Sequence, residues 1–121
     1  MANMTGNEIK DCWDKIITAY KETERPDHCI QRVLEEMNLE EALETFAAIA
    51  QIKSHDGRIY GKNRDEMEKI SVDESCLKWE HGNPLVYKGL DEIHPTHINQ
   101  LITELLKERD AREMDDIEPE L

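Results

Sequence analysis

Apolar residues recur every three or four positions through most of this chain, and that spacing predicts amphipathic helices packed on a shared core. Two helix starts carry capping boxes, in which a side chain and the residue three places later bond each other's free amides: Thr5 with Glu8, and Asn38 with Glu41. Pro26 suits the first turn of another helix, because its missing N–H would have no partner there. We therefore predict three N-terminal helices, over residues 5 to about 22, 26–37 and 38 to about 52.

The helical pattern stops at Ser54-His55-Asp56-Gly57, where Asp-Gly is a strong turn signal because glycine tolerates positive φ. The charged segment 62–69 fits either a helical turn or a loop. Residues 70–79 then alternate in part between apolar and polar side chains, and a turn cluster at 81–84 separates them from the short apolar run 85–87. This order predicts a β-hairpin. Because two strands alone are marginal in water, the hairpin is expected to pack on the helices or to extend a sheet in a partner subunit.

A last helix is expected to begin at Pro95 or Thr96, because apolar residues again recur at helical spacing up to Leu106. Residues 113–121 contain five acids and no base, which predicts a disordered acidic tail. The predicted fold class is therefore α+β, with residues 1–112 forming one domain of N-terminal helices, a small antiparallel hairpin and a C-terminal helix. The lean core, with 38% hydrophobic residues, favours an oligomer in which subunit contacts add stability.

The net charge of −13 argues against binding to a nucleic-acid polymer or to an anionic membrane. Acids dominate both ends of the chain, but residues 51–70 carry five bases against four acids. A small anionic ligand would therefore meet the least repulsion in this segment, although the same composition also suits a solvated loop of mixed charge. The five bases are Lys53, Arg58, Lys62, Arg64 and Lys69.

No apolar run approaches the roughly 20 residues of a membrane span, and no signal-peptide pattern opens the chain, so the protein is expected in the cytoplasm. Cys12, Cys29 and Cys76 are scattered without a CxxC pair. Neither a structural disulfide nor a thiolate zinc site is therefore expected, and small buried or half-buried thiols are the favoured interpretation.

Catalytic motifs are missing from the sequence, which has no glycine-rich phosphate loop, no GxSxG turn and no Cys-His nucleophile pattern. We therefore predict a binding protein rather than an enzyme, and no cofactor. His94 and His97 form an HPTH spacing, and His55 and His81 lie in other loops. A metal site would need two or three of these to converge with a carboxylate. Capping or pocket lining is the favoured role, so no metal is expected.

Side chains suited to a planar, phosphorylated ligand gather in the second half of the chain. Aromatic faces can stack on a base, arginines can contact phosphate through two hydrogen bonds, and asparagines can read sugar or base edges. Arg58 is favoured most, because an arginine directly after Asp-Gly is held at a tight turn. Trp79 also suits the core of the hairpin, and Arg109 also suits the dipole at a helix end. The candidate ligand-binding residues are Arg58, Arg64, Arg109, Asn83, Asn99, Trp79 and Tyr87, with Tyr60 as a further aromatic face.

Two segments, Ala47–Gly61 (AAIAQIKSHDGRIYG) and Leu77–Leu106 (LKWEHGNPLVYKGLDEIHPTHINQLITELL), resemble the phage-encoded type-one Thoeris anti-defence proteins. Those proteins are sponges that capture, without cleaving them, the cyclic ADP-ribose signals made by bacterial TIR immune proteins. Some members also hold cyclic di- or trinucleotides at a separate site.

That resemblance implies an α+β fold that assembles into a homo-oligomer, as a dimer or a larger assembly with a hexamer as one option. Its ligand pockets would lie near subunit contacts, in the cytoplasm of the bacterial host. By position, the resemblance implies that Arg58 and Arg109 bind phosphate, that Asn99 is a polar reader, and that Trp79 or Tyr87 is the stacking partner.

Two other classes of function remain open. One is an acidic inhibitor without a small ligand, which mimics DNA or otherwise blocks a protein partner; the charge and the acidic end of the chain favour it. The other is a helical assembly module, which the apolar helix faces favour.

Overall fold

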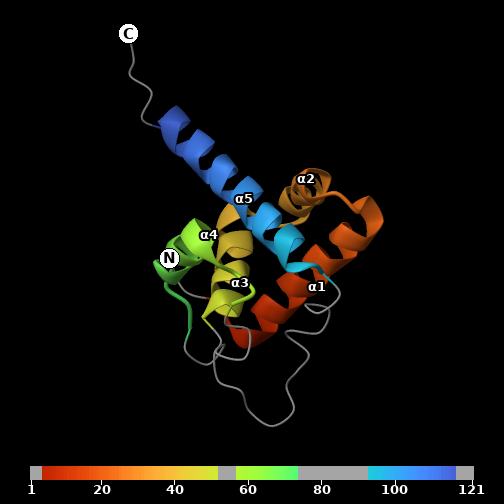
Figure 1. Cartoon of the computed structure of the whole chain (residues 1–121), viewed down its shortest axis with the longest axis horizontal. Helices are drawn as coiled ribbons and strands as arrows, with labels where there is room; N and C mark the ends of the chain where they lie inside the picture. Colours follow the sequence, from red (N-terminus) through yellow and green to blue (C-terminus); the bar gives the residue numbers. More distant parts are fainter. Residues whose placement is uncertain (1–3, 52–56, 74–92, 117–121) are drawn as a thin grey trace.

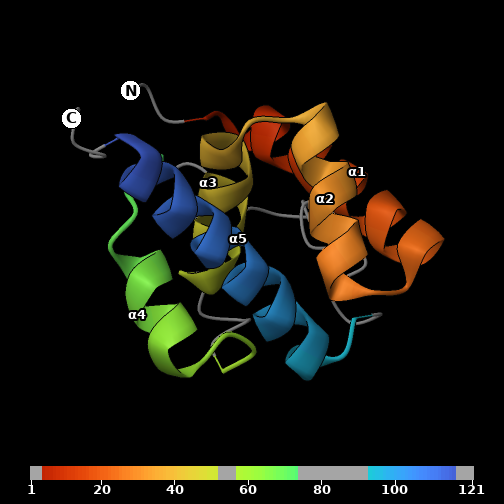
Figure 2. The same cartoon turned by 90° about the horizontal axis from the view of Figure 1, so that it is seen from above.

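The computed structural model describes residues 4–51, 57–73 and 93–116, and most of this part of the chain is helical (Figure 1). The helices are α1 (Gly6–Thr23), α2 (Pro26–Glu36), α3 (Leu39–Ala50), α4 (Gly61–Glu68) and α5 (Pro95–Asp116). Figure 2 shows α5 lying between α4 and α2, and α5 contacts α2, α3 and α4 directly. The long C-terminal helix therefore joins the N-terminal helices to α4.

Both predicted capping boxes are confirmed, and with them the three N-terminal helices. Thr5 Oγ1 accepts from the Glu8 amide at 3.2 Å, and Glu8 Oε1 accepts from the Thr5 amide at 2.8 Å. Asn38 and Glu41 exchange the equivalent bonds at 2.8 and 3.0 Å. α1 ends where Glu24 takes the left-handed conformation, with φ of 56°, and Pro26 then occupies the first turn of α2.

α3 is the central helix of the described fold. Every residue from Ala42 to Ala50 is buried, and α1, α4 and α5 all contact this helix. Trp13 of α1 packs edge-on against Phe46, with ring centroids 5.9 Å apart and the rings at 89°. Glu44 is buried with its carboxylate accepting from the Met4 amide at 2.5 Å, so the charged group on this helix has a hydrogen-bond partner.

The predicted α+β fold class is wrong for the described residues, which contain helices and no strand. Residues 70–73, the start of the first predicted strand, are irregular. Their apparent alternation arises because Ile70 packs on the core at its edge and Val72 is buried in it, while Ser71 between them is exposed. Residues 74–92, which hold the rest of the predicted hairpin, lie outside the described residues.

The charged segment that the sequence left open forms α4, whose one buried residue is Met67. Gln51, directly after α3, donates from Nε2 to the carbonyls of Met67 at 3.2 Å and Ile70 at 3.0 Å. The Met67 carbonyl also accepts from the Ile70 amide at 3.2 Å, so Gln51 adds a bond from the end of α3 to the end of α4. α4 is therefore attached to α3 by one apolar side chain and one amide.

α5 begins at Pro95, as predicted, and continues to Asp116. Residues 113–116 are therefore helical although the sequence placed them in the acidic tail, and residues 117–121 lie outside the described part. Across the described ranges, no helix combines the length and the apolar character needed to cross a membrane.

The Asn38 cap offers a direct test of how α3 begins. Replacing Asn38 with Ala removes the oxygen that satisfies the Glu41 amide, so we expect the free energy of unfolding to fall by about 1 kcal/mol. Urea denaturation followed by circular dichroism measures this change. Thr18→Ala, at an exposed position inside α1, is the control and should not lower stability, because alanine is the better helix former. Identical unfolding midpoints for Asn38→Ala and the wild-type chain would contradict the cap's role.

Candidate functional site

Four of the seven predicted ligand-binding residues lie in the described part of the chain, and all four lie along α4 and the side of α5 that faces it. We call residues 57–60, α4 and this side of α5 the α4–α5 seam. The four are Arg58, Arg64, Asn99 and Arg109. The predicted residues Trp79, Asn83 and Tyr87 lie outside the described residues, as do His55 and His81.

Asn99 is buried in the seam, at 7% exposure, and its side chain uses its full hydrogen-bonding capacity. Its Nδ2 donates to the carbonyls of Arg58 at 2.9 Å and Pro95 at 2.8 Å. Its Oδ1 accepts from the Tyr60 amide at 3.3 Å and from Asn63 Nδ2 at 3.2 Å. The predicted polar reader is therefore occupied within the protein, where it attaches the turn before α4 to α5.

Asn63 extends this network along the seam. Its Nδ2 also approaches the Asn99 carbonyl at 2.9 Å and Thr103 Oγ1 at 3.3 Å. Thr103 Oγ1 donates to the same Asn99 carbonyl at 2.9 Å. These groups are partly buried, so water could replace a lost bond only in part, and each contact helps to hold α4 against α5.

The turn that this network holds, residues 57–60, has side chains that differ in their exposure to water. Ile59 is buried at 2%, Arg58 is half-buried, and Tyr60 stands 51% exposed at the position preceding α4. Among the described residues, Tyr60 is the one exposed large hydrophobic side chain. Arg64 lies four residues later in α4, and its amide donates to the carbonyl of Tyr60, the N-cap residue of this helix, at 3.4 Å. Arg64 Nε bonds Glu68 Oε1 at 2.9 Å, and their side chains are 39% and 50% exposed.

Arg109 lies farther along the seam and contacts the protein's own acids. Its Nη2 lies 3.1 Å from Glu66 Oε1 and 3.2 Å from Asp110 Oδ1. Hydrogen bonds from Lys69 first and from Arg109 second hold the pKa of the Glu66 carboxyl below its ordinary value. Asn99, which bonds the Arg58 carbonyl, lies ten residues before Arg109, or about 15 Å along the helix axis. The backbones of the two predicted phosphate-binding arginines are therefore anchored apart.

His94 and His97 have structural partners at the start of α5. The Thr96 amide donates to His94 Nδ1 at 3.1 Å, which makes His94 the cap of the helix. His97 Nδ1 lies 2.6 Å from the Tyr20 hydroxyl and so links α5 to α1. In the described ranges, no group of three or more His, Cys, Asp or Glu residues could hold a metal ion.

Cys12 and Cys29 are buried, and burial raises the pKa of both thiols, that of Cys29 to about 12. A thiol with so high a pKa is almost entirely protonated at neutral pH and is a poor nucleophile. These two cysteines are therefore packing residues, and Cys76 lies outside the described residues.

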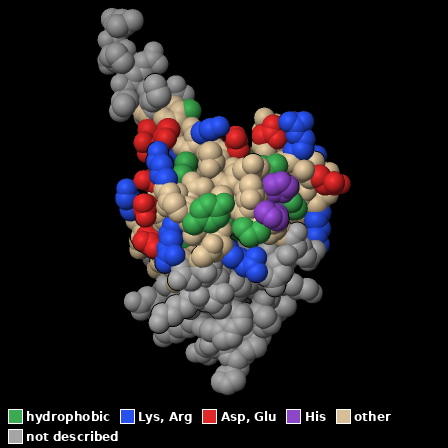
Figure 3. Space-filling view, in the orientation of Figure 1, with side chains coloured by type: hydrophobic (Ala, Val, Ile, Leu, Met, Phe, Trp, Pro, Cys, Tyr) green, Lys and Arg blue, Asp and Glu red, His purple; other side chains and the backbone are tan. Residues whose placement is uncertain are grey.

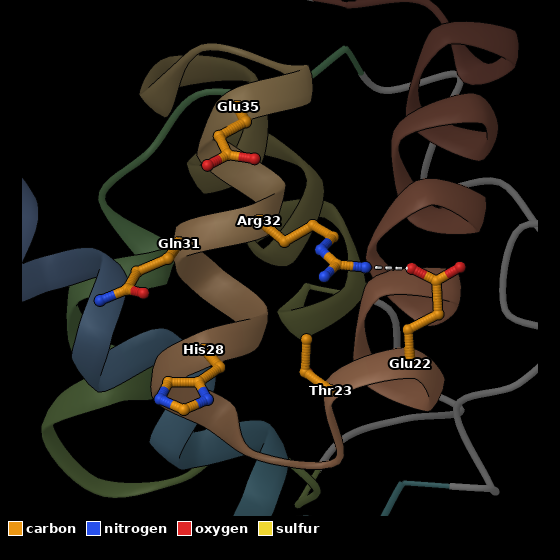
Figure 4. A pocket seen from close by; sticks show the side chains of 6 residues that line it. All are labelled: Glu22, Thr23, His28, Gln31, Arg32 and Glu35. Atoms are coloured by element: carbon orange, nitrogen blue, oxygen red, sulfur yellow. Dashed lines mark hydrogen bonds and ion pairs between the residues drawn. The ribbon is translucent and has the colours of Figure 1, made fainter.

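Two surface hollows lie on the α2 side of the molecule and contain none of the predicted residues. One, of about 450 Å³, lies between α2 and α5. The other, of about 480 Å³, lies over α1 and α2, where Arg32 bonds Glu22 (Figure 4). Figure 4 shows Arg32 extending towards α1 while Gln31 extends away from it, so these side chains do not converge on one ligand. Sequence reasoning missed both hollows, because exposed polar positions on α2 look the same as any solvated helix face.

The role of Asn99 can be tested by replacing its side-chain amide nitrogen with an oxygen. In Asn99→Asp, an oxygen replaces the Nδ2 donor and faces the carbonyls of Arg58 and Pro95, so we expect unfolding to become easier by about 2 kcal/mol at neutral pH. The penalty should shrink at acidic pH, because a protonated carboxyl can again donate one bond. Urea denaturation at both pH values measures it. Asn7→Asp, at an exposed position of α1, is the matched control, and an equal response of the two variants would rule out the clamping role.

No family model, no curated protein and no solved structure matches this chain.

Proposed function

We propose that this chain is a phage anti-immune sponge, which sequesters cyclic ADP-ribose-type signal nucleotides without cleaving them and so blocks Thoeris-type defence in the host cytoplasm. Cyclic di- or trinucleotides are further candidate ligands. The observation that carries the proposal is the exposed Tyr60 side chain at the N-cap of α4, with Arg58 on the same turn and Arg64 in the first turns of the helix, on a backbone held by Asn99. An aromatic face and a guanidinium are the groups that recognise a base and a phosphate.

The helices differ from the α+β fold that the resemblance implies, so the proposal rests on side-chain chemistry and not on fold. Its support is also electrostatic: in a chain of net charge −13, residues 51–70 hold more bases than acids. An anion approaching the protein would meet the least repulsion at the seam.

The interactions available on the seam can supply the binding free energy that a sponge needs. Micromolar to nanomolar affinity needs about −8 to −12 kcal/mol. A stacked base contributes about 1 to 3 kcal/mol, and each charge-assisted hydrogen bond roughly 1.5 to 3 kcal/mol. Arg64 must exchange Glu68 for phosphate, but such exposed pairs contribute only about 0 to 1 kcal/mol. Because Asn99 already holds the turn, binding orders little additional backbone.

A bound nucleotide on the seam would keep one side in water unless something covered it. The predicted homo-oligomer supplies a cover, since a second copy could close over Tyr60. In this arrangement the ligand would be held between subunits, and its release would require the subunits to separate. Light scattering after size-exclusion chromatography, with and without nucleotide, follows the assembly state.

The proposal predicts tight, non-destructive binding. Calorimetry with a panel of cyclic ADP-ribose isomers and cyclic oligonucleotides should give a Kd at or below the micromolar range for at least one of them. Chromatography of the heat-denatured complex should then return that ligand unchanged. Tyr60→Ala and Arg58→Ala should each weaken binding at least tenfold, whereas Arg32→Ala, which removes an arginine on α2, should not.

Two results would contradict this function. One is the absence of detectable binding to every nucleotide of the panel, at micromolar concentration of protein that is shown to be folded. The other is the appearance of cleaved nucleotide, which would indicate an enzyme.

The second candidate is an acidic inhibitor that mimics DNA and blocks a protein partner. The net charge of −13 favours it, and so do exposed acids along α1 and α2 such as Asp11, Asp14 and Glu35. Against it, Figure 3 shows acids and bases interleaved on the face drawn there, where a mimic would need acids alone. Its partner binding should weaken steeply as salt rises, because exposed charges are screened within about 10 Å at 0.1 M salt.

A further inference from the structure

Glu66 connects two cations that come from different places on the seam. Its Oε1 bonds Arg109 of α5 at 3.1 Å, and its Oε2 bonds Lys69, directly after α4, at 3.0 Å. Each carboxylate oxygen therefore neutralises a different positive charge. A phosphate with its oxygens in the same places would satisfy the same two groups.

This carboxylate differs from those of the neighbouring ion pairs in its burial. The Glu66 side chain is 17% exposed, against 50% for Glu68 and 42% for Glu108. Arg109 is 28% exposed and Lys69 is 70% exposed, so water screens the Glu66–Arg109 pair less than the Glu66–Lys69 pair. The lowered pKa of Glu66 agrees with a carboxylate that stays ionised at neutral pH.

A tethered carboxylate competes with any incoming anion at a high effective concentration, because it never leaves the site. A singly charged anion offers Arg109 and Lys69 no more than Glu66 already does. A pyrophosphate group carries more charge and more acceptor oxygens, so it can replace the carboxylate. Tyr60, the N-cap of the same helix, lies six residues before Glu66, about 9 Å along the axis.

We propose that Glu66 is an internal competitor on the Arg109–Lys69 pair, and that it restricts this end of the seam to anions that carry pyrophosphate. The inference rests on the proposed function only for the identity of the natural ligand. The competition itself concerns inorganic anions as well. Glu66 is thus a specificity-determining residue, and its removal should strengthen anion binding.

The test uses the full chain, with inorganic pyrophosphate and inorganic phosphate as the probes in calorimetry. Glu66→Gln keeps the size of the side chain and removes its charge, so pyrophosphate should bind at least tenfold tighter than to the wild-type chain. Inorganic phosphate should gain affinity by a similar factor, because Glu66 has to leave the same two cations before either anion can bind. Glu68→Gln is the matched control, with the same change of charge two residues away, and should alter affinity less than threefold.

The double variant Glu66→Gln with Arg109→Gln separates a local competitor from a general charge effect. The gain in pyrophosphate affinity should vanish in it. Equal gains in Glu66→Gln and Glu68→Gln, a gain that survives loss of Arg109, or no binding of pyrophosphate to folded Glu66→Gln would each overturn the inference.

If pyrophosphate behaves as expected and no cyclic nucleotide binds, the competitor stands and the proposed function fails. If a cyclic nucleotide binds and Glu66→Gln changes neither its affinity nor that of pyrophosphate, the proposed function stands and the competitor fails.

Discussion

The burial of α3 determines where the other described helices can lie. A helix whose residues from Ala42 to Ala50 are all withdrawn from water must be covered on every side. α1 covers it through Trp13, whose ring meets Phe46 edge-on, and α4 and α5 contact it as well. The small side chains at Ala47, Ala48 and Ala50 let these neighbours approach closely. The core thus sets the framework on which the seam is built.

α4 depends on this framework more than any other described helix. Its eight residues are too few for a helix to be stable alone in water, and Met67 is its one buried side chain. Asn99 holds the turn that precedes it, and Gln51 bonds the carbonyls at its end. α3 and α5 therefore support the helix from both ends. Asn63, Arg109 and Met67 add further contacts, so the position of Tyr60 and Arg64 depends on how α4 packs against both neighbours.

Local signals predicted the parts of the fold that depend on neighbours in sequence. The capping boxes and apolar spacings indicated the three N-terminal helices and the start of α5. α4 could not be chosen over a loop, because a helix with one buried residue has no apolar period. The alternation at Ile70 and Val72 was misread as a strand, since packing on a helical core leaves the same pattern.

The structure brings four of the predicted residues to the seam, but through pairs that the sequence does not indicate. Asn99 was expected to read a ligand, but it bonds the Arg58 carbonyl 41 positions away, and Arg109 bonds Glu66 across 43 positions. No sequence pattern indicates such pairs, because they follow from how α4 and α5 pack. Tyr60 and Arg64 could be related from sequence only once 62–69 was known to be helical.

When an acidic protein binds an anion through arginines that already pair with its own carboxylates, those ion pairs must break. Under the proposed function, an incoming anion would have to displace one of two carboxylates. Arg64 is paired with exposed Glu68, and Arg109 is paired with the less exposed Glu66. Solvent screens the first pair, so almost any anion could exchange there, whereas the second would yield only to a group of greater charge. Selectivity would then come from displacement rather than from the shape of a pocket. This mechanism suits an open seam between two helices, where a carboxylate can move aside and the backbone need not.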